Sequence, residues 1–309
     1  MTTPNERVAY FNGRILPESQ VTISFRDRGF KYGDAVFDAT RTFAGKSFKL
    51  REHVDRLYRS LRYLQIDPGM GPDQMIAVSE EVLDRNRPLL GTHDDYWVSQ
   101  RVSRGVDAVG GELWASSGGP TVIVECTPIP LRARARLFRQ GAQIITPSVR
   151  RTPPDALSPN AKTHNYLNLV IGDLEARAYN PNAWAVLLDV NGNLAEGLGS
   201  NIFIVERGAV VTPRADFVLA GITRDTVIDL TRDKGIPIRE EGITLYRALN
   251  ADESFITSTS LCICPVRSIN TRQVREPTIP GPLTKQLMDA FAALAGYDYV
   301  EQYLRFINE

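Results

Sequence analysis

Residues 37–66, FDATRTFAGKSFKLREHVDRLYRSLRYLQI, combine a hairpin pattern with a helix pattern. The segments FDATRTF and KSFKL flank Ala44-Gly45, which predicts two antiparallel strands joined by a tight turn. After them, apolar side chains recur at helical spacing through residue 64, which predicts an amphipathic helix. A hairpin that continues directly into a helix favours an α+β fold over a doubly wound parallel sheet.

The neighbouring segments continue this mixture of hairpins and helices. Residues 8–23 alternate between apolar and polar side chains around Asn12-Gly13, which is a strong hairpin signal. Residues 72–86 have the pattern of a second helix, and residues 96–105 and 120–130 have the composition of strands. The glycine-rich segment between those two strands, residues 106–119, predicts a mobile surface loop.

Prolines near residue 128 predict the boundary between two domains. In TPIPLR they interrupt strand pairing, and a new strand pattern begins in GAQIITPSV, residues 141–149. We therefore expect one domain over residues 1–129 and a second over residues 130–309. In the second domain we expect helices at 165–179, 223–233 and 282–295, a hairpin around Asn191-Gly192, strands at 200–205 and 209–213, and short strands around Phe255 and Ile263.

The composition argues against several classes of function. The 36 basic and 36 acidic residues cancel, so no overall field attracts nucleic acid or an anionic membrane surface. No stretch reaches the ~18 apolar residues of a membrane helix, and three cysteines are typical of a reducing, cytoplasmic location. The three histidines lack the spacing of metal ligands, so we expect no metal site.

Lys162 is the first candidate for a catalytic residue. Lysines are rare among the 36 basic residues, and this one lies between a proline-rich loop, residues 150–160, and the helix predicted to begin near Asn165. In a desolvated pocket the pKa of a lysine falls, and its amine becomes a nucleophile and a base at neutral pH. A solvated surface lysine is the alternative on this ground alone.

The residues around Lys162 and several distant segments resemble one enzyme family. AKTHNYLN (161–168) is followed by Glu196 in NLAEGLGSNIFIV, by LAGITRD (219–225) and by the polar cluster ITSTS (256–260). RDRGFKYGDAVFDATR (26–41) and REHVDRLYRS (51–60) extend the match to the N-terminal half. Together these segments resemble the fold type IV pyridoxal phosphate enzymes, which include branched-chain and D-amino acid aminotransferases, (R)-selective amine transaminases and aminodeoxychorismate lyase.

This resemblance implies an α+β fold with two domains, each a mixed or antiparallel sheet with flanking helices, the C-terminal one barrel-like. It implies that Lys162 holds pyridoxal 5'-phosphate covalently and carries a proton between the substrate Cα and the cofactor's C4′. It also implies that Glu196 pairs with the pyridine nitrogen and that Tyr166, about one helical turn after Lys162, hydrogen-bonds the phenolic oxygen. The other cofactor-binding residues that it implies are Arg56, Ile222, Thr223 and Thr259 at the phosphate and Leu219 against the ring. Taken alone, Glu196 could equally face water at a hairpin edge, and Tyr166 could be a core residue.

The segment YGDAVFDATR is most similar to the branched-chain enzymes, although those usually have YGDGVFEG, from which Ala35, Asp38 and Ala39 depart. Arg104 matches an arginine with which the D-amino acid enzymes bind the substrate carboxylate, but Phe37 replaces a tyrosine of their carboxylate site. Arg104 could also be an exposed strand-edge charge. The predicted substrate-binding residues are Tyr32, Phe37, Arg41, Arg104 and Ser260.

The leading hypothesis is an aminotransferase that moves an amino group between a donor and a 2-oxo acid. Leucine, isoleucine or valine with 2-oxoglutarate is the first expected pair. The alternatives are a D-amino acid or (R)-selective amine transaminase, a lyase that releases pyruvate from an aminodeoxychorismate-like substrate, and a pyridoxal phosphate carrier without activity. The resemblance further implies a homodimer whose active site lies between the two domains and is completed by a loop of the partner.

Overall fold

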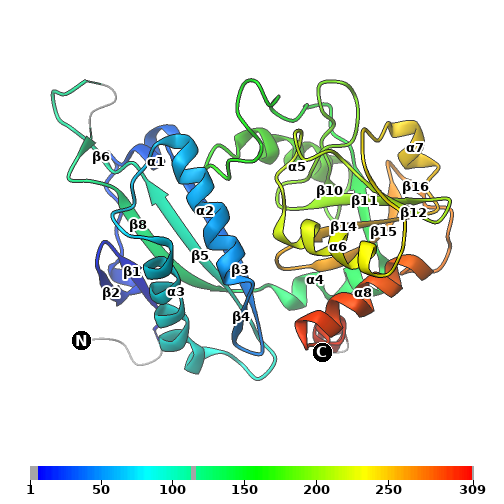
Figure 1. Ribbon diagram of the computed structural model, residues 1–309, viewed down its shortest axis with the longest axis horizontal. Coiled ribbons are helices and arrows are strands. Elements are labelled where there is room, and N and C mark those ends of the chain that lie inside the picture. The colour runs from blue at the N-terminus through cyan, green and yellow to red at the C-terminus, as the bar shows by residue number, and fades with distance from the viewer. Residues whose placement is uncertain (1–5, 113–115, 308–309) are drawn as a thin grey trace. The chain divides into compact units, whose positions relative to one another are not determined.

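The computed structural model describes residues 6–112 and 116–307. The chain divides into two compact units (Figure 1). Met1–Ile129 and Ala161–Asn165 form the first, and Pro130–Asn160 and Tyr166–Glu309 form the second. The boundary between two domains after residue 129 stays a prediction. We did not predict that residues 161–165, which include Lys162, belong to the first unit.

The first unit is built on an antiparallel sheet of six strands in the order β2-β1-β8-β5-β3-β4. Both predicted hairpins are present, because Asn12 and Gly13, like Ala44 and Gly45, take the positive φ angles that tight hairpin turns require. The strands are β1 (Val8–Phe11), β2 (Arg14–Pro17), β3 (Ala35–Phe43), β4 (Lys46–Phe48), β5 (Tyr96–Ser103) and β8 (Thr121–Pro128).

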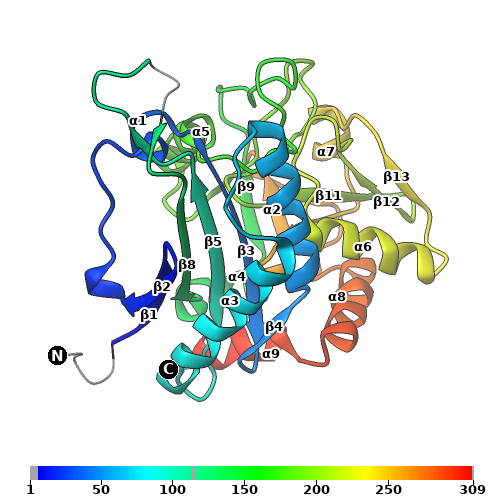
Figure 2. The ribbon, with the colours of Figure 1, turned by 60° about the vertical axis from the view of Figure 1, so that its left-hand side comes forward.

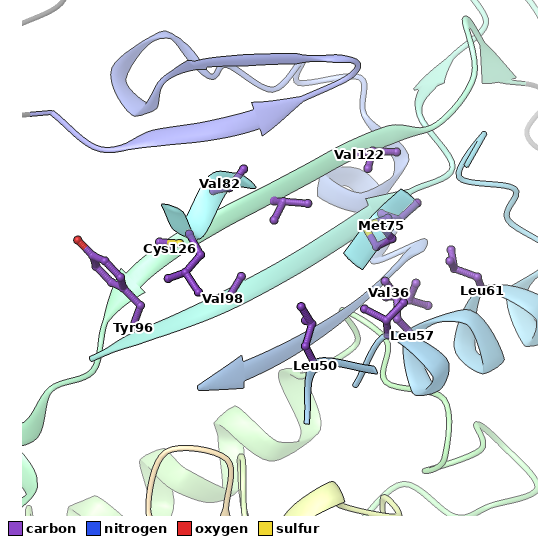
Figure 3. Close-up of a cluster of buried hydrophobic side chains, with 14 of the residues drawn as sticks. Val36, Leu50, Leu57, Leu61, Met75, Val82, Tyr96, Val98, Val122 and Cys126 are labelled. Carbon is purple, nitrogen blue, oxygen red and sulfur yellow. The ribbon is translucent and has the colours of Figure 1, made fainter. Parts of the chain in front are cut away.

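Two helices cover one face of this sheet (Figures 1 and 2). They are α2 (Leu50–Leu64) and α3 (Pro72–Asn86), and they pack against β3, β8 and each other. The short helices of this unit are α1 (Arg28–Tyr32), η1 (Glu18–Gln20) and η2 (Arg87–Leu89). Between the sheet and the helices lies a core that includes Val36, Leu57, Met75, Val82 and Val98 (Figure 3). All five are fully buried, and each such side chain contributes about 1.5–3 kcal/mol to folding.

The segment predicted as a mobile loop carries a small ribbon. Here β6 (Val106–Asp107) pairs antiparallel with β7 (Ser116–Ser117). Residues 113–115, within the predicted loop, lie outside the described residues. The loop prediction missed this pairing because two-residue strands leave no alternation in the sequence.

The second unit contains a mixed sheet in the order β10-β9-β15-β14-β11-β12-β13, with β16 beside β15. Isolated bridges such as Leu188 with Leu194 and Asn193 with Thr244 add further pairing within this unit. The strands are β9 (Ala142–Ile145), β10 (Trp184–Ala185), β11 (Asn201–Glu206), β12 (Ala209–Thr212), β13 (Ile238–Glu240), β14 (Glu253–Ser258), β15 (Cys262–Ile269) and β16 (Arg272–Gln273).

The three helices predicted for the second unit, over residues 165–179, 223–233 and 282–295, are present, and the described part of this unit also has helices at 131–140, 245–249 and 299–304 that we did not predict. The helices are α4 (Leu131–Gln140), α5 (Leu167–Tyr179), α6 (Ile222–Asp233), α7 (Leu245–Leu249), α8 (Pro282–Ala295) and α9 (Tyr299–Leu304), followed by η3 (Arg305–Ile307). We predicted no helix at α4. The buried residues of α4 are Leu131, Ala135 and Phe138, and the arginines between them hide the helical period. Within the described ranges, no helix is both long and apolar enough to cross a membrane.

Candidate active site

The segment that carries Lys162 is held as an extended strip beside β3. The Phe37 N–H donates to the Lys162 carbonyl oxygen at 3.0 Å, and the His164 N–H donates to the Ala35 carbonyl oxygen at 2.9 Å. The Lys162 N–H donates to the Ser60 hydroxyl on α2, also at 3.0 Å. Both polar groups of the Lys162 backbone are therefore fixed by the first unit.

The side chain of Lys162 lies over the ring of Phe37, with 4.5 Å between Nζ and the ring centroid. The Arg101 guanidinium lies 5.4 Å from the same centroid, and the His164 imidazole meets the ring edge-on at 5.4 Å. Burial lowers the pKa of His164 to about 4, and the nearby charge of Arg101 adds to this effect. The His164 ring is therefore neutral at pH 7, and the Lys162 amine has an aromatic surface on one side.

Arg56 lies on the buried face of α2 and is paired with Asp38 on β3. Its Nε donates to Asp38 Oδ2 and one terminal nitrogen donates to Oδ1, both at 2.8 Å. His53, one turn earlier on α2, contacts the same carboxylate at 2.7 Å. Sequence analysis named Arg56 but missed these two partners. The spacing of His53 and Arg56 on one face of a predicted helix was the only available signal.

Glu196 in the second unit is a buried carboxylate with a partner on each oxygen. Arg151 Nε donates to Oε1 at 2.9 Å, and the Leu219 N–H donates to Oε2 at 3.0 Å. The Leu219 carbonyl in turn accepts from the side-chain amide of Asn201 at 3.0 Å. This arrangement brings Glu196 and Leu219 together and differs from the alternative of a hairpin-edge glutamate facing water.

Helix α6 begins at Ile222, with Gly221 as its N-cap and no side chain capping the first turn. A Cβ on Gly221 would lie 2.2 Å from the side-chain oxygen of Asn201, so only glycine fits here without a shift. Thr223 is buried in the first helical turn. The first-turn amides and the positive end of the helix dipole form a surface suited to an anion.

The turn after β14 contains Thr259 and Ser260. Arg134 on α4 donates to the Ser260 hydroxyl at 2.6 Å, and the Tyr303 hydroxyl donates to the Ser260 carbonyl at 2.8 Å. The neighbouring Thr257 hydroxyl is buried without a hydrogen-bond partner in the described part of the chain. The turn is thus tied to two helices and is rich in hydroxyl groups.

Tyr166 does not relate to Lys162 in the way that its spacing suggested. Residues 162–165 are not helical, and Tyr166 is the N-cap of α5, which begins at Leu167. The helical-turn argument was therefore wrong, because the chain stays extended past Lys162 to pair with β3. Tyr166 is half-buried and packs against the apolar cluster that includes Leu169 and Leu187.

Two of the predicted substrate-binding arginines are engaged within the first unit. Arg41 is 1% exposed, lies 3.6 Å from the Asp95 carboxylate and covers the Phe43 ring. Its predicted contact with substrate stays a prediction. Arg104 donates to both oxygens of Asp34, at 2.7 and 3.0 Å, and to the last carbonyls of α2. A substrate carboxylate at Arg104 would have to compete with Asp34.

Tyr32 ends α1 and is 44% exposed, with Arg28 and Lys31 over its ring. Its predicted contact with substrate stays a prediction. The described residues contain no group of three histidine, cysteine or carboxylate side chains placed to hold a metal ion.

Comparison with known proteins gives one consistent family. Residues 35–269 match the model of the family described as amino-transferase class IV. A putative branched-chain-amino-acid aminotransferase of Methanocaldococcus jannaschii is 39% identical over 283 residues, which cover 91% of this chain and 94% of the relative. The D-alanine aminotransferase of Bacillus licheniformis is 30% identical over 281 residues, again 91% of this chain and 94% of the relative.

Solved structures agree with these relatives. The branched-chain amino acid aminotransferase of Escherichia coli is 29% identical and superposes with a TM-score of 0.84, covering 94% of this chain and 94% of that one. A second branched-chain amino acid aminotransferase, solved with pyridoxamine 5'-phosphate, superposes with the same TM-score. The α+β fold and the motifs around Lys162 and Glu196 thus have the same explanation, and the chain belongs to the class IV aminotransferases.

Proposed function

We propose that this pyridoxal 5'-phosphate-dependent aminotransferase moves the amino group of a branched-chain L-amino acid to 2-oxoglutarate. The observation that carries the choice of donor is the Phe37 ring, which lies 4.5 Å from the Lys162 amine. An aromatic surface directly beside the reacting amine suits an aliphatic side chain. The branched-chain name of the relative that is 39% identical supports the same choice.

The residues of the second unit fit this cofactor. A phosphate requires backbone donors at a helix start and hydroxyl groups, and the uncapped first turn of α6 with the buried Thr223 supplies both. The unpartnered hydroxyl of Thr257, two residues before Thr259, is a further polar atom of that segment within the described ranges. For the pyridine nitrogen, Glu196 offers a carboxylate that is already oriented by Leu219 and Arg151.

When bound, the cofactor supplies an aldehyde that takes up the amino group and a ring that draws electrons from the substrate Cα. Lys162 Nζ would hold the cofactor until substrate arrives, and would then take the proton from Cα and deliver one to the carbon that receives the amino group. Glu196 would accept a hydrogen bond from the ring nitrogen and keep the ring an electron acceptor. Arg56, Ile222, Thr223 and Thr259 would bind the phosphate, Tyr166 the phenolic oxygen, and Leu219 one ring face.

An assay of amine transfer to 2-oxoglutarate tests the proposal. L-leucine, L-isoleucine and L-valine should react faster than D-alanine and (R)-1-phenylethylamine. Lys162→Ala should lower the rate by a factor of about 10²–10⁴, whereas Lys46→Ala, an exposed lysine of the same unit, should not. Faster transfer from D-alanine would identify a D-amino acid enzyme, which the Bacillus licheniformis relative and Arg104 favour as the second candidate. Pyruvate release without an acceptor would identify a lyase.

We further propose a cytoplasmic homodimer. Helix α5 has an exposed apolar stripe at helical spacing, formed by Leu167, Val170, Ile171 and Leu174, whose exposed fractions range from 37% to 69%. An apolar stripe of this kind marks a protein contact surface, and a second copy of the chain is the partner that the family resemblance implies. Cys126, Cys262 and Cys264 are buried and are not joined in disulfides within the described residues, which suits a reducing compartment.

A further inference from the structure

Asp38, His53 and Arg56 form a cluster of buried polar side chains in the first unit, and the proposed function uses only one of them. Asp38 comes from β3, and the other two come from α2, which packs against β3 (Figure 2). Their exposed fractions are 0%, 2% and 4%, respectively. Polar groups this deeply buried require a specific arrangement of partners.

The Asp38 carboxylate accepts four hydrogen bonds. Oδ2 accepts from Arg56 Nε at 2.8 Å, and Oδ1 accepts from an Arg56 terminal nitrogen at 2.8 Å and from the Ala39 N–H at 2.8 Å. His53 Nδ1 lies 2.7 Å from the same Oδ1. Four donors match the acceptor sites of one ionised carboxylate. The two parallel bonds to Arg56 also fix the plane of its guanidinium group.

The protonation states agree with this arrangement. Burial alone would raise the pKa of Asp38, but its interactions with Arg56 and His53 outweigh burial and hold that pKa well below its usual range. Burial lowers the pKa of His53 against the opposing attraction of Asp38. An ionised Asp38 can only accept, so His53 Nδ1 carries the proton and donates it. His53 therefore fixes Asp38, and Asp38 fixes Arg56.

We propose that Asp38 and His53 are positioning residues that orient Arg56 for the phosphate group of the cofactor. This inference rests on the proposed contact between Arg56 and the phosphate. The hydrogen bonds that link His53 through Asp38 to Arg56 should affect only the binding of the phosphate group. They should not affect the binding of the aldehyde or the ring of the cofactor. Loss of Asp38 should therefore weaken binding of pyridoxal 5'-phosphate while leaving binding of pyridoxal, which lacks the phosphate, nearly unchanged.

The test compares dissociation constants of these two ligands for the cofactor-free protein, measured by absorbance titration. Asp38→Asn replaces one oxygen, which accepts hydrogen bonds, by an NH₂ group, which can only donate and would face other donors. The variant therefore no longer fixes the orientation of Arg56, although the volume of the side chain hardly changes. We expect the dissociation constant of pyridoxal 5'-phosphate to rise about tenfold or more, the usual effect of losing a charged hydrogen-bond partner, and that of pyridoxal to change less than about twofold.

Asp95→Asn is the matched control. Asp95 is equally buried in the same unit and pairs with Arg41, so this variant should leave the ratio of the two constants unchanged. His53 provides a second series in case Asp38→Asn does not fold. His53→Leu, which removes the donor to Asp38, should shift the ratio in the same direction, and His53→Asn, which keeps a donor near Nδ1, should restore part of it.

Three outcomes contradict the proposal in distinguishable ways. If Arg56→Gln weakens pyridoxal 5'-phosphate alone but Asp38→Asn and His53→Leu do not, Arg56 keeps its proposed role and the positioning role is wrong. If Arg56→Gln affects both ligands equally or neither, the proposed phosphate contact fails and the positioning role fails with it. An equal loss for both ligands in Asp38→Asn would assign Asp38 to the fold alone.

Discussion

Lys162 could be predicted from the sequence because lysine chemistry is particular and its neighbours form a motif. Glu196 and Arg56 were proposed as site residues on the same evidence of motifs, and their roles stay predictions. Asp38 and His53 were missed because their importance arises where β3 meets α2, and no local pattern records that contact. The contacts of Arg41 with Asp95 and Phe43 could not be predicted for a related reason, since no local pattern shows how the fold encloses a strand arginine.

His164 leads to a prediction about pH and stability. Its folded pKa of about 4 lies below the value of about 6.5 expected in the unfolded chain. Between these values the unfolded state binds more protons, so the free energy of unfolding should fall as the pH drops from about 6.5 to about 4, by at most about 1.4 kcal/mol per pH unit.

Urea denaturation of wild type and His164→Gln at several pH values measures this effect. The variant should have a flatter dependence over that range, because glutamine does not titrate. His93→Gln, which makes the same replacement at an exposed histidine, is the matched control. Equal slopes for wild type and His164→Gln would mean that His164 is not held neutral.

Long, strongly periodic elements could be predicted from the sequence almost to the residue. Helices α3 and α8 begin and end where their patterns do, and the turns at Asn12-Gly13 and Ala44-Gly45 follow from residues that accept positive φ. Helix α4 and the ribbon β6–β7 were not predicted, and neither were the short helices α7 and α9. Arginine-rich spacing hides the period of α4, and the ribbon pairs two very short segments across a loop.

The ribbon leads to a prediction about one glycine. Gly105 precedes β6 with a φ of +92°, and a Cβ there would lie 1.9 Å from the Gly119 carbonyl oxygen. Gly105→Ala should therefore introduce backbone strain and a steric clash with the Gly119 carbonyl group, which is part of the backbone and cannot move away as a flexible side chain could. Together these effects should lower the free energy of unfolding by roughly 2–4 kcal/mol.

Gly110→Ala is the matched control, since that residue has a φ of +73° and open space around its Cβ position. It should cost about 1–2 kcal/mol from backbone strain alone. Thermal unfolding of both variants is the measurement. Equal midpoints would show that the close approach of Gly105 to Gly119 does not constrain the native fold.

The division into two units could be approached from the sequence, because the prolines near residue 128 interrupt the strand pattern there. That residues 161–165 belong to the first unit could not be predicted from the sequence. It depends on a bridge between Thr163 and Val36, which are far apart in the chain. The family followed from short motifs spread over both units, which is why it could be recognised although the contacts that orient its residues could not.

The proposed homodimer leads to a prediction at the same scale. Leu174→Lys puts a charge into the apolar stripe of α5, so it should convert a species of twice the 34.4 kDa chain mass into a monomer. Leu294→Lys, at an isolated exposed leucine of α8, should leave the mass unchanged. Sedimentation analysis of the two variants decides, and a dimer that survives Leu174→Lys would rule out this stripe as the interface.

The central claim is that one amine of this chain bonds to the cofactor. Borohydride reduction of the purified holoenzyme, followed by digestion and mass spectrometry, tests it most directly. The account predicts a phosphopyridoxyl group on the peptide that contains Lys162 and on no other. A label on a different lysine, or no label on protein that holds the cofactor, would contradict it.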